Sequence, residues 1–233
     1  SVQHRMYDTP GGNVQYEVST GSGAITNHLS IGSDLDFQSI DEYRHPNLGL
    51  AEEGPELLSD QAIQQRGVGV YAIDHVQIGN RWGVMLGLRG DHIRNELTDQ
   101  LKAGGVDLSG TATFSKATGR VGVSFNPKPD VGLYAAWGQG FLPPATEELA
   151  NNPDNLGGFN THLEPATSQG VEFGVRGARS GTIWDVALFR LDTDNDFGRY
   201  RVTWRPLETF YGNVGSSRRY GLETSIGYFG TPD

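Results

Sequence analysis

The sequence predicts an all-β protein: an antiparallel up-and-down transmembrane β-barrel, of which this chain forms an incomplete segment of about nine strands. Apolar side chains recur at every second position, so an extended chain places them on one face. Short turns and long polar loops alternate strictly along the chain. Glycine supplies 33 of the 233 residues, about twice the usual share, and no collagen period or low-complexity tract accounts for it. Strand faces and turns must therefore contain it.

Composition excludes several classes of protein. The formal net charge is -10 and no basic stripe is present, so nucleic acid is not an expected partner. The chain has no cysteine, which rules out disulfides and thiolate metal sites. No apolar run approaches the roughly 18 residues of a membrane-spanning helix, and the mean hydropathy is -0.44. Membrane strands remain possible, because alternation keeps their average hydrophobicity low.

Turn residues divide the chain into strands. Tight connections are predicted at 20–23, 79–80, 126–130 and 179–181, and long ones at about 37–61, 95–110 and 142–165. Both ends of the chain, "SVQHRMYDTPGGN" and "IGYFGTPD", are expected to be cuts through a longer protein. The nine expected strands are 13–20, 24–37, 61–79, 81–95, 110–126, 130–141, 166–179, 182–203 and 207–229.

The stretch from Gly67 to Ile93 shows the alternation directly in its second half, from Trp82 to Leu88, whereas the faces of its first half depend on the turn between them. A two-residue turn at Gly79-Asn80 would place Tyr71 and Ile73 on the apolar face with Leu86, and Asp74 on the polar face with Arg89. A three-residue turn would reverse this assignment.

The two strand faces differ sharply in chemistry. One is apolar throughout, while the other carries glycine and a set of acids and bases that we call the lumen charge network. Such a face suits the interior of a filled barrel, whereas the outer face of a soluble β-sandwich, the alternative, is usually richer in Lys, Thr, Ser and Glu. The lumen charge network consists of Asp74, Arg89, Arg120, Glu172, Arg176, Arg219 and Glu223.

Four phrases resemble the barrel of TonB-dependent outer-membrane receptors, in the same order. They are "GVYAIDHVQIGNRWGVMLGLRGDHI", "LYAAWGQGFLPPATEEL", "LEPATSQGVEFGVRG" with "WDVALFRLDTDN", and "NVGSSRRYGLETSIGY", and the likeness covers about residues 61–229. The resemblance implies a barrel of about 22 strands in the outer membrane of a Gram-negative bacterium. It also implies a globular plug domain and uptake of a scarce nutrient, usually a ferric siderophore, with energy from the TonB complex.

The chain departs from that whole in three ways. It has no plug domain, no recognisable TonB-coupling box near its start and no terminal strand ending in an aromatic residue. Residues 1–233 are therefore expected to form part of the barrel domain only. The resemblance implies four partners: outer-membrane lipid, the plug domain of the same full-length protein, the TonB complex through that plug, and the siderophore or another small nutrient.

No motif for catalysis or metal binding is present, so we expect transport, no enzyme activity, no metal site and no cofactor apart from a ferric chelate as cargo. Haem, cobalamin or a saccharide are alternative cargoes, and a passive porin or a soluble β-sheet binding module are alternative proteins. Aromatic residues beside arginine in the long loops suit an anionic, partly flat chelate, although aromatics at strand ends also form the interfacial girdle. The candidate ligand-binding residues are Tyr43, Arg44, His45, Phe141, Phe159, Asn160, His162, Tyr200, Arg201, Trp204 and Arg205.

Overall fold

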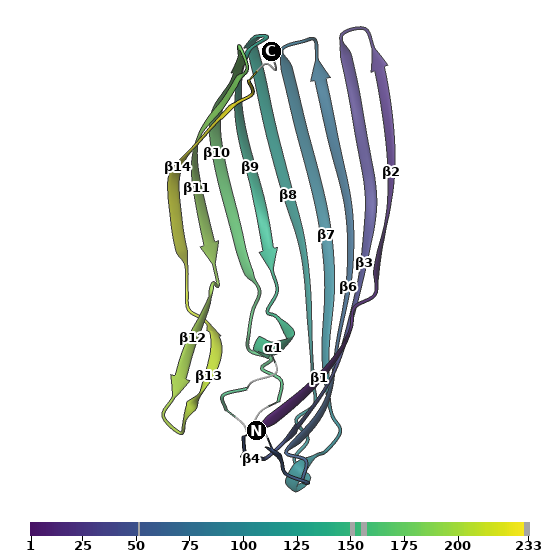
Figure 1. The fold of residues 1–233 in the computed structure, drawn as a ribbon. Helices are drawn as coiled ribbons and strands as arrows, with labels where there is room; N and C mark the ends of the chain where they lie inside the picture. Colours follow the sequence, from purple (N-terminus) through teal and green to yellow (C-terminus); the bar gives the residue numbers. More distant parts are fainter. Residues whose placement is uncertain (51, 150–151, 155–157, 231–233) are drawn as a thin grey trace.

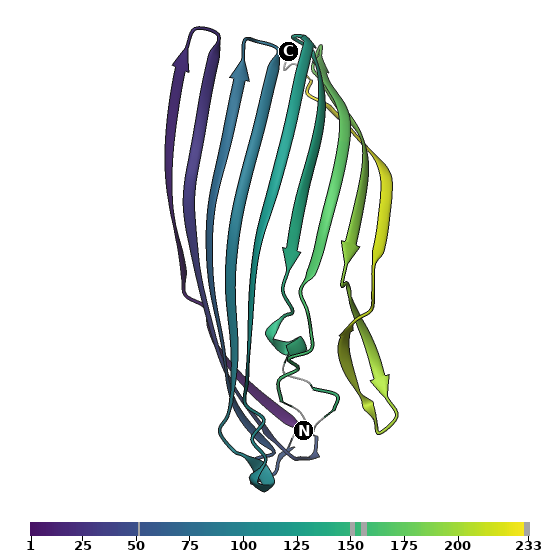
Figure 2. The same cartoon turned by 180° about the vertical axis from the view of Figure 1, so that it is seen from behind.

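One strongly curved antiparallel sheet makes up most of the protein (Figures 1 and 2). The computed structural model describes residues 1–50, 52–149, 152–154 and 158–230. Neighbouring strands of the sheet follow the order β1-β3-β6-β7-β8-β9-β10-β11-β14, with β2 also paired to β3. Its members are β1 (Val2–Asp8), β2 (Gly11–Ser22), β3 (Ile25–His45), β6 (Ser59–Ile78), β7 (Trp82–Asp99), β8 (Gly110–Lys128), β9 (Val131–Leu142), β10 (Ala166–Arg179), β11 (Thr182–Asp194) and β14 (Ser217–Tyr228).

Smaller elements lie in the long connections. Two short hairpins are formed by β4 (Asn47–Gly49) with β5 (Glu52–Glu53) and by β12 (Phe197–Val202) with β13 (Arg205–Asn213). A 3₁₀ turn covers Ala103–Gly105, and the short helix α1 covers Thr146–Leu149. Within the described residues, no helix combines the length and the apolar character needed to cross a bilayer.

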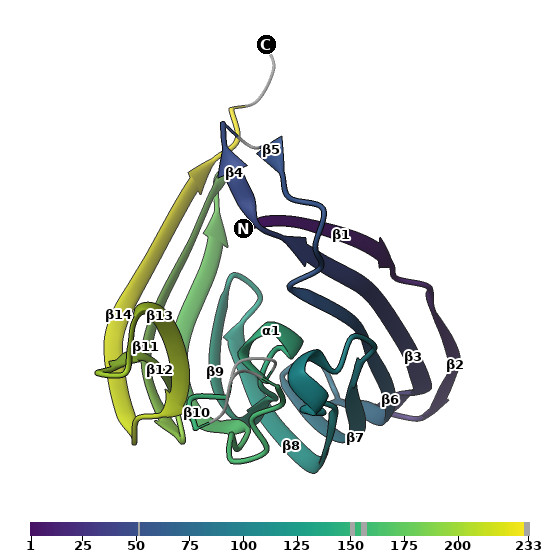
Figure 3. The same ribbon diagram turned by 90° about the horizontal axis from the view of Figure 1, so that it is seen from below.

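The edge strand is interrupted but keeps its register. Asp8 pairs with Ser39, and Gly11 pairs with Asp36, so β1 and β2 are successive parts of one strand along β3. The break coincides with Pro10, which has no N–H to donate to the ladder. The sheet is therefore nine strands wide, as predicted, and it does not close into a barrel in this chain (Figure 3). The first strand begins earlier than the predicted residue 13.

The last predicted hairpin, 182–203 with 207–229, is also interrupted. Thr193 pairs with Ser217 and Phe197 pairs with Asn213, so β12 and β13 continue the register of β11 and β14. Between the two parts, Asn195 and Gly215 adopt positive φ values of 55° and 116°. These two residues bend the hairpin without shifting its register (Figure 1).

Short turns and long connections lie at opposite ends of the sheet, as the sequence predicts. The turns after β2, β6, β8 and β10 meet at one end, and α1, β4 and the β12–β13 hairpin lie at the other (Figure 1). Outer-membrane barrels have short periplasmic turns and longer extracellular loops. We call the end with the long connections the mouth.

The convex face is apolar. Leu88, Phe173 and Leu222 keep 72%, 61% and 62% of their surface exposed, although each has the side chain of a core residue. A soluble sheet would bury such side chains, whereas a membrane barrel presents them to hydrocarbon. The predicted two-faced strands are confirmed over most of the sheet.

The predicted turn at Gly79-Asn80 is wrong by one residue. Ile78 pairs with Trp82, so the turn contains three residues, and Gly79 takes a left-handed φ of 57°. Since one residue of slip exchanges the faces, Tyr71 lies opposite Arg89 on the concave side. Asp74 lies opposite Leu86 on the convex side and does not belong to the lumen charge network. Its Oδ1 accepts a hydrogen bond from Asn27 Nδ2 at 2.6 Å.

Glycines on the concave face leave room for long side chains of neighbouring strands. A Cβ on Gly69 would lie 2.2 Å from Arg89 Nη2, and one on Gly32 would lie 2.4 Å from the ring of Tyr71. A Cβ on Gly174 would likewise meet the ring of Tyr134. The side chains of Arg89, Tyr71 and Tyr134 therefore lie flat against the wall, which is why this face combines glycine with large polar residues.

We expect Gly69→Val to destabilise the barrel by displacing Arg89, which crosses Gly69 to reach Asp34 at 2.6 Å. The loss should be about 1–2 kcal/mol, because the ion pair is partly exposed and screened. The midpoint of urea unfolding of the receptor in detergent measures it. Gly12→Val is the matched control, since a Cβ on Gly12 meets nothing within 4 Å. Equal midpoints for the two variants would contradict the packing role of Gly69.

Candidate functional site

A buried cluster at the mouth fastens the third long connection, described at residues 143–149, 152–154 and 158–165, to the concave wall. Three wall residues lie in register on neighbouring strands, because Ile40 of β3 pairs with Ile63 of β6, which pairs with Leu97 of β7. Side chains from the connection complete the cluster, and α1 lies within the curve of the sheet (Figure 3). The buried members are Ile40, Ile63, Leu97, Leu149, Phe159 and Leu163, with Ala112, Phe114, Phe197 and Tyr211 packed against them.

The β12–β13 hairpin holds the same connection from the other side. Trp204 Nε1 donates to the carbonyl of Pro153 at 3.2 Å, and Arg205 Nη1 donates to the carbonyl of Asn152 at 3.3 Å. Arg205 also lies over the ring of Phe210, 5.0 Å from its centroid. The candidates Trp204 and Arg205 therefore lie where they fasten the connection.

The other candidates of this connection divide between its interior and its surface. Phe159 and Asn160 are buried, with 6% and 5% of their surfaces exposed. Phe159 packs over Gly110, and Asn160 accepts the backbone N–H of His162 on its Oδ1 at 3.1 Å. His162 itself is exposed. Phe141 pairs with Thr167 and lies on the convex face, which it shares with Trp137.

The first long connection contributes residues to both faces. Tyr43 and His45 lie on the convex side, where His4 stacks on Tyr43 with 4.8 Å between ring centroids. Arg44 lies on the concave side, and its Nη2 is 2.7 Å from Glu42 Oε1. Arg5 Nε donates to the other oxygen of Glu42 at 2.6 Å. Of these three candidates, only Arg44 faces the interior.

A groove of about 450 Å³ opens on the β12–β13 hairpin. It is lined by Arg199, Tyr200, Arg201, Thr209 and Tyr211. Arg199 lies over the ring of Tyr211, 5.5 Å from its centroid. Tyr211 packs against the buried cluster at the mouth, so this face of the hairpin looks toward the interior. The sequence predicted Tyr200 and Arg201 but missed Arg199, Thr209 and Tyr211, whose place depends on the pairing of the hairpin.

The remaining members of the lumen charge network lie on the concave face. Arg89 forms ion pairs with Asp34 at 2.6 Å and with Asp91 at 2.8 Å. Sequence reasoning missed both carboxylates, because only the strand register brings Asp34 across Gly69 to Arg89. The others are Arg120, which lies over Gly87; Arg176, over the ring of Tyr134; Arg219, 4.0 Å from Asp196; and Glu172 and Glu223, on the concave faces of β10 and β14.

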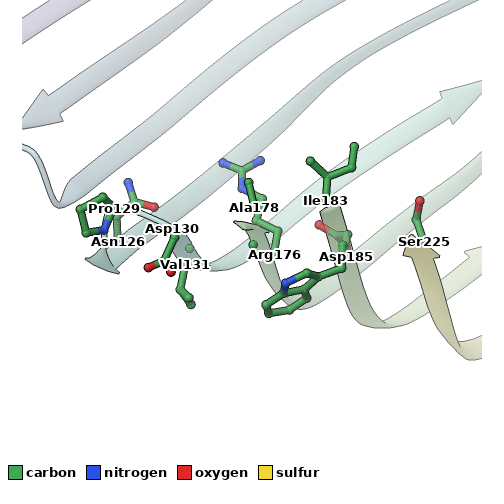
Figure 4. A pocket seen from close by; sticks show the side chains of 12 residues that line it. Asn126, Pro129, Asp130, Val131, Arg176, Ala178, Ile183, Asp185 and Ser225 are labelled. Atoms are coloured by element: carbon green, nitrogen blue, oxygen red, sulfur yellow. The ribbon is translucent and has the colours of Figure 1, made fainter. Parts of the chain in front are cut away.

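Further hollows lie along the interior. One of about 550 Å³ is lined in part by His28, Tyr71, Arg89 and Arg120, in the middle of the wall. Another of about 400 Å³ lies by the short turns, where Asp130 and Arg176 contribute to its lining (Figure 4). Among the described residues, no group of three or more acidic or histidine side chains is placed to hold a metal ion.

Comparison with known proteins decides the family. The family model described as "TonB dependent receptor-like, beta-barrel" matches residues 3–230. The chain belongs to the TonB-dependent receptors. Their barrels lie in the outer membrane of Gram-negative bacteria, so the convex face meets lipid and the mouth opens outside the cell. The resemblance predicted from the four phrases is thus confirmed.

Individual relatives of this TonB-dependent receptor segment are distant. It is 25% identical over 171 residues to the probable TonB-dependent receptor BfrD of Bordetella pertussis, covering 71% of this chain and 22% of that protein. It is 24% identical over 167 residues to the probable TonB-dependent siderophore receptor PiuA of Acinetobacter baumannii, covering 67% and 21%. The chain thus spans about a fifth of the length of these curated relatives.

Among solved structures, the hemophore receptor HasR of Serratia marcescens, determined with its hemophore HasA and heme, superposes with a TM-score of 0.77. The identity is 15%, and the match covers 98% of this chain and 40% of HasR. At this identity the likeness shows the barrel fold alone.

Proposed function

We propose that the receptor containing this chain takes up a ferric siderophore, bound at the mouth and passed through a plugged barrel with energy from the TonB complex. The observation that supports it most directly is the groove on the β12–β13 hairpin, where Arg199 and Arg201 accompany Tyr200 and Tyr211. Guanidinium groups bind carboxylate and other anionic oxygens, and aromatic faces accept flat chelating groups. PiuA, a relative over two thirds of the chain, is named as a probable siderophore receptor.

The arrangement of the mouth supports the same proposal. The described parts of the third long connection are fastened to the interior wall, so cargo would meet the hairpin groove and the exposed His162 before the wall below. Arg44 forms an ion pair with Glu42, so we assign it a structural role at the mouth and not a role in binding cargo. The plug would lie in the interior, where Arg89, Arg120 and Arg176 line the wall, and the TonB complex would act through the plug.

Binding of a panel of cargoes to the purified full-length receptor tests the proposal. The panel holds hydroxamate, catecholate and α-hydroxycarboxylate iron chelates, together with haem, cobalamin and an oligosaccharide, and calorimetry reports the affinity. We expect one class of ferric chelate to bind. Replacing Arg199 and Arg201 together by Gln should weaken that chelate at least about 10-fold, because charge-assisted contacts are lost.

The control is Arg179→Gln, which removes one positive charge at the opposite end of the sheet. Its affinity for the chelate should equal that of the unmodified receptor. Failure of every chelate, with binding of haem, cobalamin or the saccharide instead, would overturn the siderophore proposal. An unchanged chelate affinity in the Arg199 and Arg201 variant would remove the hairpin groove from the binding site.

A further inference from the structure

Two arginines face each other on the convex side, just beyond the apolar band. Arg66 of β6 pairs directly with Arg94 of β7. On β6 the convex positions from Val68 to Ile78 are apolar apart from Asp74. This stretch is about 33 Å of strand, or about 25 Å along the membrane normal for a tilted strand, which matches the lipid-facing band of such barrels. Arg66 and Arg94 therefore lie where hydrocarbon gives way to the headgroups of the outer leaflet.

Like charges directly opposite each other destabilise a strand pair. Arg94 Nη2 lies 3.3 Å from Glu96 Oε2, while Arg66 Nη2 donates to the neutral Gln64 at 3.1 Å and its guanidinium lies 5.8 Å from the ring centroid of Phe37. Among the described residues, no carboxylate contacts both arginines. Glu96 contacts Arg94 alone, and both arginine side chains are exposed. The pair has unused donors and an excess of positive charge.

A second pair of arginines on the same face shows how an anion can bridge such a pair. Arg190 of β11 and Arg218 of β14 both lie on the convex side beyond Leu188 and Leu222. Asp192 lies between them, with one oxygen 2.8 Å from Arg190 and the other 2.5 Å from Arg218. A bridging anion therefore relieves the repulsion at that site. At Arg66 and Arg94 the corresponding anion is missing from the described residues.

We propose that Arg66 and Arg94 bind a phosphate of a phosphorylated glycolipid in the outer leaflet of the membrane. Guanidinium groups bind phosphate bidentately, and two of them from adjacent strands can bind one phosphate between them. The acyl chains of the same lipid would lie along the apolar convex surface at Val68, Val70 and Leu88, which are exposed. His92, hydrogen-bonded to Ser115 Oγ at 2.8 Å, borders the site on the membrane side of Arg94.

Native mass spectrometry of the full-length receptor with lipid A tests the proposal. We expect bisphosphorylated lipid A to remain bound to the unmodified receptor, and dephosphorylated lipid A to be lost. Replacing Arg66 and Arg94 together by Gln should lower retention of the bisphosphorylated lipid at least about 10-fold, and replacing both by Lys should retain part of it. Heat-modifiable migration on gels confirms that each variant is folded, and the single Gln variants give intermediate losses.

The matched control is Arg179→Gln, on the convex face of β10 beside the short turns. It removes one positive charge, as each single Gln variant does, at the inner-leaflet side of the band, so lipid A retention should not change. Equal losses in the Arg179 variant and in the Arg66 and Arg94 variant would overturn the proposal, as would unchanged retention in the latter. Displacement of the lipid by millimolar inorganic phosphate would assign the arginines to a free anion and would equally overturn it.

Discussion

Leu149→Ala should release residues 143–165 from the wall. Leu149 is completely buried in the cluster at the mouth, next to wall residues such as Leu97, and its carbonyl accepts the N–H of Asn160 at 2.6 Å. Truncating a buried leucine costs about 2–5 kcal/mol through lost contacts and the cavity that remains. Local opening of the connection should then become at least about 30-fold more frequent, and cleavage by a protease added to whole cells should accelerate by the same factor.

Leu142→Ala provides the control for this experiment. Leu142 is the last residue of β9, directly before the same connection, and keeps 60% of its surface exposed, so its truncation leaves little cavity. Cleavage of this variant should occur at nearly the unmodified rate. If both variants were cleaved equally fast, the buried cluster would not be what holds the connection across the mouth.

Leu86→Arg should impair assembly into the membrane. Leu86 lies on the convex face within the apolar band, and 51% of its surface is exposed. An arginine facing lipid near the middle of such a band costs about 2–4 kcal/mol, depending on depth. The fraction of receptor that becomes heat-modifiable in outer-membrane preparations, together with the urea midpoint of the purified protein, measures the loss.

Met85, the residue before Leu86, supplies the control because its side chain lies on the opposite, concave face. Met85 pairs with His75 and Gly122 on the concave face, where water and polar side chains can receive a charge. Met85→Arg should therefore assemble far better than Leu86→Arg. Equal assembly of the two variants would mean that the two faces of β7 do not meet different solvents.

The fold was largely predictable because alternation is a local property of the sequence. Val121 and Val123 reveal the lipid face of β8 without knowledge of any neighbour. The turn after Ile78 was not predictable in this way, because two- and three-residue turns suit the same Gly-Asn sequence and differ only in register. That single residue moved Asp74 to the convex face and Tyr71 to the concave one.

The site was less predictable, since its residues meet through pairings between strands. The sequence marks Arg89 as an inward charge, but its partner Asp34 is 55 positions away and lies two strands across the sheet. Phe159 likewise looks like a ligand-facing aromatic until Leu149 and Leu163 are placed around it. Exposed loop composition alone does not distinguish a side chain that fastens a loop from one that contacts cargo.

The break between β11–β14 and β12–β13 changes the direction of the hairpin without changing its register. Because Asn195 and Gly215 bend the hairpin while the pairing keeps its register as far as Tyr200, Arg199 and its partner Tyr211 stay on the side that continues the interior face of β11 and β14. The hairpin can therefore grow or shrink by whole pairs of residues during evolution without turning Arg199 and Tyr211 outward. Receptors of this kind can in this way change the reach of one loop while the barrel beneath it stays the same.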